Sequence, residues 1–504
     1  MKNKKIPIII GTMETGRLSN AFGPGSEMFY SKKGGLGDVI PVLSAGLINR
    51  GADVHIVMPN LKTQFMRENG VTKKEWVAKR HKVAPKNIHL IDSHYIGHLP
   101  HVYAGDTTLT AAIFQSKAAS IIKTIRSQAD GQGIYISNDW MTCGYLSAYL
   151  ATRGTPILHM IHSVHTGYIK ISDYYDTPMS DFRHNFYFKH GESDVIDSHA
   201  TGIKNATYVG VVGNAFLHEI LHDRFPEMVP PSVLGELRAK YVHGQTLFLP
   251  NGLYENMLPE NQADIFKKFQ GKYFTTETED LVSAKKKNKL AFQKILKLNE
   301  DPDACLFFWP SRVDSFQKGI HLLEEIAIKF VRKHKNAQIA IVADPTNDRE
   351  NHKEILTDIS LDSSGQVCYY GFEKDLSNFG YSAADFILSA PSFEPYGFFI
   401  PQGLAAGSMI IVTNTGGGRD MVVDYKTDKL MGNGVHLKNH SSEALFEAME
   451  KALKIHDFFL KKPEIYNNEI RRFMTEARKN QGSEKMIDGY MNILEIINGN
   501  KPIC

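Results

Sequence analysis

Cysteine is scarce in this chain of 504 residues, and its four cysteines are Cys143, Cys305, Cys368 and Cys504. They form no C-x-x-C pair, which argues against a disulfide framework or a cysteine zinc site and favours a reducing compartment. Long hydrophobic runs are also missing, because the apolar stretch after the basic start already ends at Gly11. Such a stretch is too short for a signal peptide or a membrane span, so we expect a cytoplasmic protein without a membrane partner.

An excess of charge of one sign is missing as well, since 58 basic residues face 55 acidic ones for a formal net charge of +3. This balance argues against an extended nucleic-acid-binding face, so we expect no nucleic-acid partner. A local basic cleft for an anionic ligand is still compatible with these numbers. The chain is too long for one compact core, which predicts two or three domains.

What the sequence does contain is two series of short β-branched runs, each ended by glycine, proline or a polar turn. Continuous apolar runs of this length are typical of strands buried on both faces of a parallel sheet. Helical patterns such as 39–49 and 319–332 lie between the runs, and this alternation predicts two doubly wound α/β domains. The first series is 6–10, 54–58, 134–136, 157–161, 208–212 and 246–249, and the second is 306–309, 338–342, 367–370, 386–388 and 409–412.

The turn signal Pro250-Asn-Gly252 marks the predicted boundary between the two domains. We assign 1–250 to the first domain, 251–481 to the second and 482–504 to a C-terminal helix. Residues 254–300 are charged and contain no strand pattern, which predicts a solvated connecting helix that carries the lysine-rich run 285–289. Ligands of open α/β sheets bind beyond the carboxyl ends of the strands, so two such domains would enclose a cleft.

The segment Lys32–Asp38, with the sequence K-K-G-G-L-G-D, precedes a helical pattern that starts at Val39. Adjacent glycines let the backbone approach a phosphate closely, and a helix N-terminus adds N–H donors and a positive field. A lysine beside the loop supplies a point charge for the same anion. The pattern suggests a phosphate-binding loop, and a plain glycine turn with solvated lysines explains it equally well.

Further polar segments follow strand runs of the second series. Arg312 and Lys318 follow 306–309, where a guanidinium and an ammonium can clamp a diphosphate as it leaves. Glu394 follows 386–388, and a carboxylate there can bind sugar hydroxyls or stabilise an oxocarbenium-like centre. The glycine run within 415–420 is similar to an anion- or sugar-binding loop at a helix start. Each segment alone is also compatible with an ordinary solvated turn.

In this order and at these separations, the segments resemble the motifs of bacterial glycogen synthases and plant starch synthases. Lys32–Asp38, preceded by Ser26-Glu27, resembles K-x-G-G-L-x-D; Asn138–Trp140 resembles H-D-W; His162, with Gly167 nearby, resembles the histidine of I-H-N; Asn251–Leu253 resembles N-G-[IV]; Arg312 with Gln317–Gly319 resembles S-R-x-x-x-Q-K-G; Phe393–Gly397 resembles F-E-P-C-G; and Thr415–Asp420 resembles T-G-G-x-x-D. The match extends over about residues 6–425, and its anchors are distinctive in combination.

The resemblance implies a retaining GT-B glycosyltransferase, with two Rossmann-like domains facing a central cleft and a C-terminal helix that crosses back. The implied reaction moves glucose from ADP-glucose or UDP-glucose to the 4-hydroxyl at the non-reducing end of an α-1,4-glucan, without a metal or another cofactor. In the implied roles, Arg312 and Lys318 neutralise the departing diphosphate, Glu394 holds the glucose, and Asp139 and His162 lie on the sugar and acceptor side. The implied donor-binding residues are Lys32, Gly34, Gly35, Tyr396, Gly397, Gln402, Thr415, Gly416 and Gly417.

Several positions depart from the family pattern. Asn138 replaces the first histidine of H-D-W, Ser163 replaces the asparagine of I-H-N, and Tyr396 replaces the cysteine of F-E-P-C-G. Phe316 is one extra residue between Arg312 and Lys318, which predicts a bulge in the loop that carries both cations. Gln402 stands where related transferases carry a second glutamate. These departures leave open another sugar donor, a smaller glycoside acceptor, or a scaffold that binds glucan without catalysis.

A motif from a different class of enzyme is also present, since His218-Glu-Ile-Leu-His222 satisfies H-E-x-x-H. On a helix the two histidines would share a face and could bind zinc, with Glu219 as the general base of a metalloprotease. No clear third ligand follows, and Pro226 would end the helix soon after the motif. The zinc hypothesis therefore has less support than sugar transfer.

Overall fold

The computed structural model describes residues 5–82, 86–174, 179–345 and 351–499, so that Cys504 and residues 1–4 lie outside the description. The chain forms two compact units. Unit 1 comprises residues 1–212, 217–251 and 483–504, and unit 2 comprises residues 213–216 and 252–482. The other three cysteines are free thiols buried in these units. Among the described residues, no helix is both long enough and apolar enough to cross a membrane.

Unit 1 is built on a parallel sheet of seven strands in the order β3-β2-β1-β4-β5-β8-β9. Its strands are β1 (Pro7–Gly11), β2 (Asp53–Pro59), β3 (Ile88–Ile91), β4 (Ile134–Asn138), β5 (Ile157–Ile161), β8 (Tyr208–Val211) and β9 (Thr246–Phe248), and a separate antiparallel hairpin consists of β6 (Tyr168–Lys170) and β7 (Val195–Asp197). The strand order reverses between β1 and β4, and ligands of such sheets bind outside the carboxyl ends at this point.

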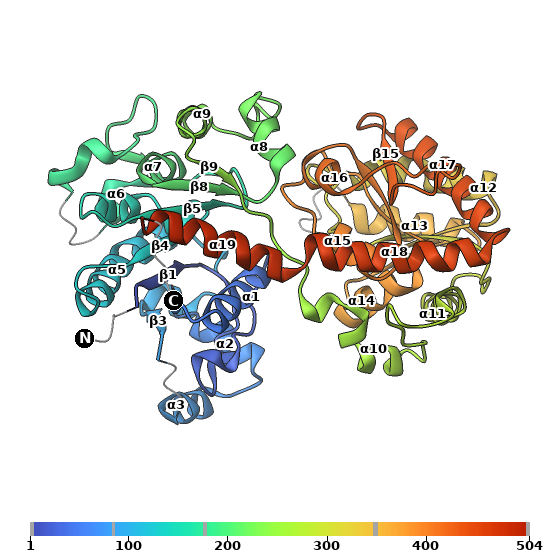
Figure 1. Ribbon diagram of the computed structural model, residues 1–504, viewed down its shortest axis with the longest axis horizontal. Helices are drawn as coiled ribbons and strands as arrows, with labels where there is room; N and C mark the ends of the chain where they lie inside the picture. The colour runs from blue at the N-terminus through green and yellow to red at the C-terminus, as the bar shows by residue number, and fades with distance from the viewer. Residues whose placement is uncertain (1–4, 83–85, 175–178, 346–350, 500–504) are drawn as a thin grey trace. The chain divides into compact units, whose positions relative to one another are not determined.

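Helices lie on both faces of the sheet in unit 1 (Figure 1). They are α1 (Leu36–Asn49), α2 (Lys62–Glu68), α3 (Lys73–Lys82), α4 (His94–His98), α5 (Thr107–Gln128), α6 (Tyr145–Ala151), α7 (Ser198–Asn205), α9 (Pro231–Val242) and α19 (Ser483–Ile497), while α8 (Asn214–Leu221) has residues in both units. The C-terminal helix α19 crosses back and packs on α1, as the family resemblance implied. A Cβ atom at Gly46 would lie 2.1 Å from Ile487 Cδ1, so the missing side chain permits this close packing.

Unit 2 contains a second parallel sheet of six strands in the order β12-β11-β10-β13-β14-β15, which again reverses beside its first strand. The strands are β10 (Cys305–Trp309), β11 (Ala337–Val342), β12 (Val367–Tyr370), β13 (Phe386–Ser389), β14 (Met409–Thr413) and β15 (Gly434–Leu437). The helices are α10 (Ala263–Lys268), α11 (Leu281–Leu296), α12 (Ile320–Lys333), α13 (His352–Asp362), α14 (Lys374–Ala383), α15 (Phe399–Ala405), α16 (Gly416–Met421), α17 (Ser442–Leu460) and α18 (Pro463–Gln481).

Every predicted strand run matches a parallel strand to within two residues at either end. The apolar signal was clear because strands such as β10, β11 and β14 are buried along their whole length. The sequence pattern missed the edge strands β3 and β15 as well as the hairpin β6–β7. In β3 only Ile91 is fully buried, and β6 alternates exposed and buried residues, so neither carries a continuous apolar signal.

The prediction that the first helix starts at Val39 was wrong by three residues, because α1 begins at Leu36. Gly37 therefore lies in the first turn, where a Cβ atom would come within 2.8 Å of Lys32 Cγ. Asp38 also lies in this turn, and a carboxylate is favourable near the positive end of a helix. The loop and the helix consequently form one tightly packed feature.

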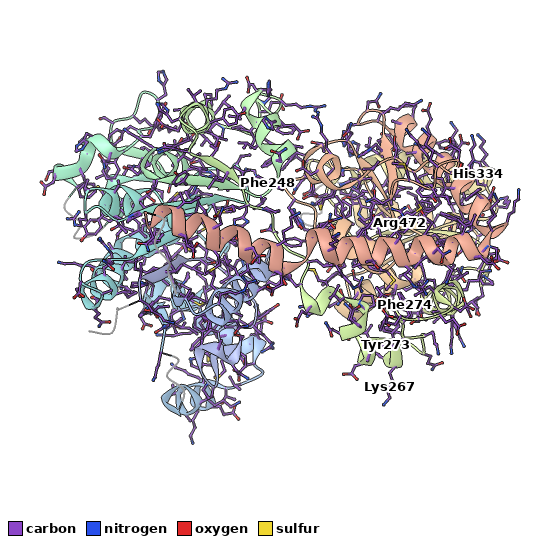
Figure 2. All side chains as sticks on the ribbon, viewed as in Figure 1. Phe248, Lys267, Tyr273, Phe274, His334 and Arg472 are labelled. Atoms are coloured by element: carbon purple, nitrogen blue, oxygen red, sulfur yellow. The ribbon has the colours of Figure 1, made fainter. Side chains whose placement is uncertain are left out.

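The prediction of a solvated connector over residues 254–300 was also wrong. Phe266 and Phe274 are buried in the core of unit 2, with ring centroids 5.9 Å apart, while the neighbouring Lys267 and Tyr273 are exposed (Figure 2). On α11, the side chains of Lys285 and Lys289 point inward, since residues four apart share a helix face, and each is only 2% exposed. The composition of this helix is that of a surface helix, but its ammonium groups have partners inside the unit.

The carboxylate of Asp385 is the centre of this buried polar cluster. Lys289 Nζ lies 2.6 Å from Asp385 Oδ2, and the amide of Leu306 donates to the same oxygen at 2.8 Å. Burial by itself would raise the pKa of Asp385, but the positive charge of Lys289 and the neighbouring His456 hold this pKa below its ordinary value. Lys285 Nζ donates separately to Ser408 Oγ at 3.0 Å. The cluster thus ties α11 to the sheet.

We expect Asp385→Asn to lower the free energy of unfolding of unit 2 by about 3 kcal/mol near pH 7, because it leaves the buried Lys289 ammonium without a counter-ion. Urea denaturation measures this loss. The matched control is Asp375→Asn, whose partner Lys268 is 48% exposed, and this change should cost less than about 1 kcal/mol. Because the pKa of Asp385 is depressed, its contribution is present above the unfolded value of about 3.9 and disappears as the pH falls through the folded value. Equal losses in the two variants would contradict the prediction.

Candidate functional site

In unit 1, polar residues gather after the carboxyl ends of β1, β4 and β5, on both sides of the point where the strand order reverses. Glu14 follows β1, Asp139 follows β4, and His162 follows β5. Burial raises the pKa of Asp139, and the negative charge of Glu14 adds to this rise. The fold thus brings together the predicted Asp139 and His162, and it adds a carboxylate that the sequence motifs did not single out.

The predicted phosphate-binding loop already has partners within the chain. Lys32 Nζ lies 2.5 Å from Asp38 Oδ2, and the backbone amides of Lys33 and Gly34 donate to Glu14 Oε2 at 2.5 and 2.6 Å. Gly35 is the residue that precedes the first turn of α1. The two amides therefore donate to a carboxylate of the same chain, and phosphate binding by this loop stays a prediction.

Glu14 and its neighbour Tyr103 are the residues that motif reasoning missed. Glu14 is 1% exposed, and the Tyr103 hydroxyl donates to its Oε1 at 3.0 Å. Burial raises the pKa of Glu14, although the amides of Gly34 and Lys33, Tyr103 and Lys32 oppose this rise. The only sequence signal for Glu14 is its place four residues after the predicted strand 6–10, and Tyr103 has none.

Asp139 has a strained backbone and a perturbed carboxyl group. Its φ of 52° and ψ of −177° lie in a region that is almost confined to glycine, and such strain concentrates at functional sites. Its Oδ1 accepts hydrogen bonds from the amides of His162 at 2.8 Å and Ser163 at 3.0 Å. Burial raises the pKa of Asp139 to about 7 even though these two amides lower it. The group can therefore change charge near neutral pH.

The His162 imidazole is oriented by Asn138, one of the departures from the family pattern. Asn138 Nδ2 donates to the carbonyl of Gly11 at 2.9 Å, which turns the amide oxygen toward His162 Nε2 at 3.1 Å. That oxygen can only accept, so Nε2 carries the proton and Nδ1 carries the lone pair. Burial lowers the pKa of His162 to about 4, which keeps the ring neutral at physiological pH.

In unit 2, the two predicted cations lie on the loop after β10. Arg312 Nη2 donates to Gln317 Oε1 at 2.8 Å. Asp314 Oδ1 accepts a hydrogen bond from the backbone N–H of Gln317 at 3.0 Å. The extra residue Phe316 is 63% exposed at the tip of this turn, and its carbonyl accepts the Ser392 hydroxyl at 2.7 Å. The insertion is thus absorbed in the turn, which remains attached to the segment that carries Glu394.

The ammonium of Lys318 and the carboxylate of Glu394 are in direct contact, with Nζ 2.6 Å from Oε2 and side chains only 12% and 7% exposed. The glycine run 416–418 packs against the backbone of the Glu394 segment. A Cβ atom at Gly416 would lie 1.8 Å from the Glu394 carbonyl oxygen, and one at Gly417 would lie 1.6 Å from that of Tyr396. The Gly417 amide donates to the Glu394 carbonyl at 2.9 Å. The glycines are therefore required for this close approach.

The other predicted donor-binding residues of unit 2 have different surroundings. Gly397 follows Glu394 closely in the chain and has a φ of 83°. Thr415 directly precedes the glycine run and is 4% exposed. The Tyr396 ring packs on Phe398 at 5.0 Å, and its buried hydroxyl has no hydrogen-bond partner within the described residues. Gln402 lies on α15, where its Nε2 donates to Asn378 Oδ1 at 3.2 Å. Its amide is thus already engaged by a neighbouring helix.

The two histidines of H-E-x-x-H lie one helical turn apart, with the His222 backbone amide donating to the His218 carbonyl at 3.0 Å and ring centroids 6.5 Å apart. His222 Nδ1 also lies 2.7 Å from the His218 carbonyl oxygen, so this ring nitrogen already has a partner in the chain. Glu219 is buried beside Arg224 at 3.3 Å. In the described part of the chain, only Cys305, Asp385 and His456 bring three potential metal ligands within 4.8 Å of one another. Lys289 already neutralises that carboxylate, so this group forms part of the buried polar cluster.

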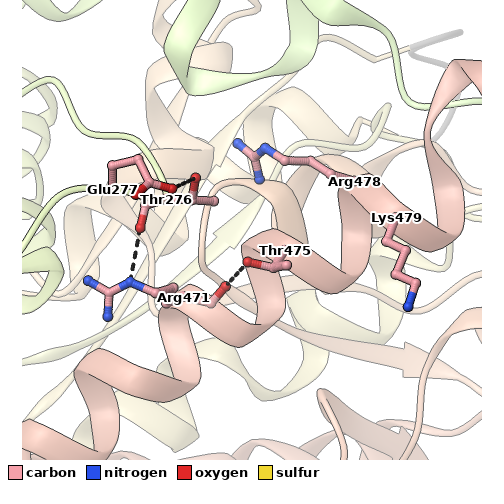
Figure 3. Close-up of a pocket in the computed structure, with 6 residues that line it drawn as sticks. All are labelled: Thr276, Glu277, Arg471, Thr475, Arg478 and Lys479. Carbon is pink, nitrogen blue, oxygen red and sulfur yellow. Dashed lines mark hydrogen bonds between the residues drawn. The ribbon is translucent and has the colours of Figure 1, made fainter.

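A separate pocket of about 610 Å³ opens in unit 2 beside α18 (Figure 3). Its lining residues are Thr276, Glu277, Arg471, Thr475, Arg478 and Lys479. Arg471 Nε donates to the Thr276 carbonyl at 2.9 Å, and Arg478 pairs with Glu260 at 2.5 Å. Arg471 thus fastens the loop before α11 to α18, and Arg478 fastens the segment before α10 to the same helix. No predicted site residue lines the pocket.

Comparison with known proteins relates this geometry to a family. The model of the starch synthase catalytic domain matches residues 25–229, and the model of glycosyl transferases group 1 matches residues 292–473. A glycogen synthase of Exiguobacterium sibiricum is 25% identical over 451 residues, which cover 84% of this chain and 89% of that protein. Together these matches show a glycosyltransferase of the glycogen and starch synthase type. The glycogen synthase of Flavobacterium johnsoniae is 23% identical over 493 residues, and this alignment covers 93% of this chain and 96% of that protein.

Solved structures of other glycosyltransferases share the fold of this chain. The catalytic domain of starch synthase IV from Arabidopsis thaliana, bound to ADP and acarbose, aligns with a TM-score of 0.71 at 17% identity and covers 96% of this chain and 99% of that one. A sucrose-phosphate synthase from Thermosynechococcus elongatus aligns with a TM-score of 0.58 at 14% identity, with 99% and 100% coverage. These structures confirm the predicted GT-B fold. The family models and the curated relatives confirm the predicted glucosyltransferase class of the synthase type.

Proposed function

We propose that this synthase transfers glucose from ADP-glucose or UDP-glucose to the non-reducing end of an α-1,4-glucan, with retention of the anomeric configuration. The observation that carries the proposal is the contact between Lys318 and Glu394, with Arg312 on the same loop. A cation and a carboxylate at one point match the two charges of the reaction, a departing diphosphate and an electron-poor anomeric carbon. The related starch synthase IV domain binds ADP and acarbose, which supports a nucleoside diphosphate as the leaving group here.

In the proposed reaction, the bond between the anomeric carbon and the diphosphate oxygen breaks while a bond to the acceptor hydroxyl oxygen forms, and the proton of that hydroxyl passes to the departing diphosphate. Lys318 and Arg312 stabilise the negative charge on the leaving nucleoside diphosphate, and Glu394 holds the glucose. Because these side chains are fixed charges on the protein, we propose that no divalent metal is needed to neutralise the diphosphate. Asp139 and His162 bind the sugar and acceptor hydroxyls from unit 1. The neutral His162, with its lone pair on Nδ1, suits a hydrogen-bonding role.

We further propose a cytoplasmic location, because the three described cysteines are buried free thiols and a nucleotide-sugar donor is a metabolite of the cell interior.

A donor and acceptor panel tests the proposed function. The purified chain is incubated with ADP-glucose, UDP-glucose or another sugar nucleotide, with glycogen, maltose or no acceptor, in buffer with and without EDTA, and nucleotide release and product are measured. We expect glucan-dependent release of ADP or UDP that EDTA does not reduce. Turnover only with a non-glucose donor would overturn the substrate proposal, and turnover only with small glycosides would overturn the acceptor proposal. No turnover with any donor would favour a glucan-binding scaffold.

A further inference from the structure

The loop that carries His162 is held at two places inside unit 1. Its first residues are fixed by Asp139, which accepts the amides of His162 and Ser163. Its later residues, 165–167, are held by the segment 197–199, which includes the first two residues of α7. The imidazole of His162 extends from the first part, where Asn138 contacts it, and the second attachment begins three residues later at His165.

Three consecutive residues make the second attachment. The His199 ring Nδ1 lies 2.7 Å from the carbonyl of His165, and the Ser198 amide donates to the Gly167 carbonyl at 3.0 Å. The Thr166 hydroxyl donates to Asp197 Oδ1 at 2.5 Å and accepts the His199 amide at 3.1 Å. The register continues from the hairpin, in which Tyr168 pairs with Asp197. Of these contacts, only those of His199 Nδ1 and Asp197 depend on side chains of the segment.

Asp197 also accepts hydrogen bonds from two helices. Its Oδ1 also accepts the Ala200 amide at 3.1 Å and so caps α7, and its Oδ2 accepts the Ser232 hydroxyl of α9 at 2.5 Å. Removing this carboxylate would therefore disturb two helices at once. His199 is the side chain whose contact with the loop can be removed selectively.

The chemistry of the His199 ring suits a fixed donor. The carbonyl of His165 can only accept, so Nδ1 carries the proton. The side chain is fully buried, and Nε2 has no hydrogen-bond partner among the described residues. Burial lowers the pKa of His199 to about 4, so the ring stays neutral through the physiological range. The His199 ring also packs edge-on against His159 on β5, with centroids 5.1 Å apart.

We propose that His199 is a positioning residue for sugar transfer: its Nδ1–H holds the His165 carbonyl and thereby places the His162 imidazole. This inference rests on the proposed function, because it assigns His162 to the sugar and acceptor side of the reaction. His199 touches no substrate in this role, so its effect passes through the backbone of residues 162–167. A displacement of a reacting group by about 1 Å can lower a rate by about a hundredfold.

The test compares His199→Leu with His199→Asn in the full chain. Asparagine carries its amide N–H near the position of Nδ1, whereas leucine has no donor. We expect leucine to lower kcat by about 10- to 100-fold with a donor KM within about twofold of wild type, and asparagine to retain kcat within about threefold. Hydrogen exchange at the amides of His162, Ser163 and Ser198 should rise at least about tenfold in the leucine variant only. If His199→Leu does not fold, His199→Gln, with its amide near the Nε2 position, takes its place.

The two readouts separate this inference from the proposed function. If the wild-type chain shows no turnover with any donor, the proposed function fails, and hydrogen exchange alone decides whether His199 fixes the loop. If the wild-type chain is active but the leucine and asparagine variants have equal kcat and equal exchange, His199 is not a positioning residue. A loss of kcat in leucine that tracks only a lower melting temperature, with unchanged exchange in the folded state, would also overturn the proposal.

Discussion

Replacing Lys318 with methionine is expected to lower kcat by about a thousandfold while the chain remains folded. The ammonium is the partly buried cation that contacts Glu394, and removing one preorganised charge from a reacting centre costs about a hundredfold to a thousandfold in kcat. The upper end applies here because both side chains are largely removed from water, where electrostatic interactions are stronger. The measurement is nucleotide release at saturating donor and glucan, with KM for the donor determined in parallel.

Two further variants define the cause of this loss. Lys438→Met is the matched control, since Lys438 forms an exposed ion pair with Glu447 and its side chain is 79% exposed. We expect this control to keep full activity. Lys318→Arg retains the charge but changes the geometry of the donor, so it should recover part of kcat. A Lys318→Met variant with kcat within tenfold of wild type would show that the departing diphosphate is neutralised elsewhere.

Asp139→Asn is expected to lower kcat by about a hundredfold to a thousandfold and, at pH 8, to stabilise unit 1. The carboxylate aligns the amides of His162 and Ser163, and an asparagine oxygen can accept the same bonds without the charge. Since the pKa of Asp139 is raised to about 7, the wild-type carboxylate is buried and charged at pH 8. Asparagine removes this penalty and tolerates a positive φ. We expect a gain of roughly 2 to 4 kcal/mol in the free energy of unfolding.

The gain in the free energy of unfolding from Asp139→Asn is expected to depend on pH. The folded pKa lies above the unfolded value of about 3.9, so the stability that the neutral acid contributes is complete below pH 4 and is lost as the pH rises through 7. The advantage of asparagine should therefore be largest at pH 8 and vanish near pH 4. Asp223→Asn, at an exposed position with a φ of 55°, is the control and should show no such trend. A gain that does not vary with pH would contradict the assigned cause.

Much of this fold could be predicted from local patterns. Buried parallel strands such as 305–309 and 409–413 are continuous apolar runs, and their alternation with helical patterns indicates doubly wound domains. The order and spacing of the glycine, lysine and glutamate motifs indicate the family. These features are local in the sequence, since a strand or a motif is encoded by a few adjacent residues.

Contacts between distant residues could not be predicted in this way. The lysines of α11 have the composition of a surface helix, yet Lys289 is buried because Asp385, far away in the sequence, supplies its counter-ion. Glu14 was not recognised because its partners Gly34 and Tyr103 come from other segments.

The sequence by itself therefore determined the architecture, the family and most of the candidate site residues, because each depends on neighbouring residues and their order. The tertiary structure alone decided which polar groups are in contact. The loop amide of Lys33 donates to Glu14, Lys318 forms an ion pair with Glu394, and the His199 ring contacts the loop that carries His162. Ion pairs and hydrogen bonds depend on distances of a few ångströms between atoms. Those distances are set only when strands and helices from separate parts of the chain pack together.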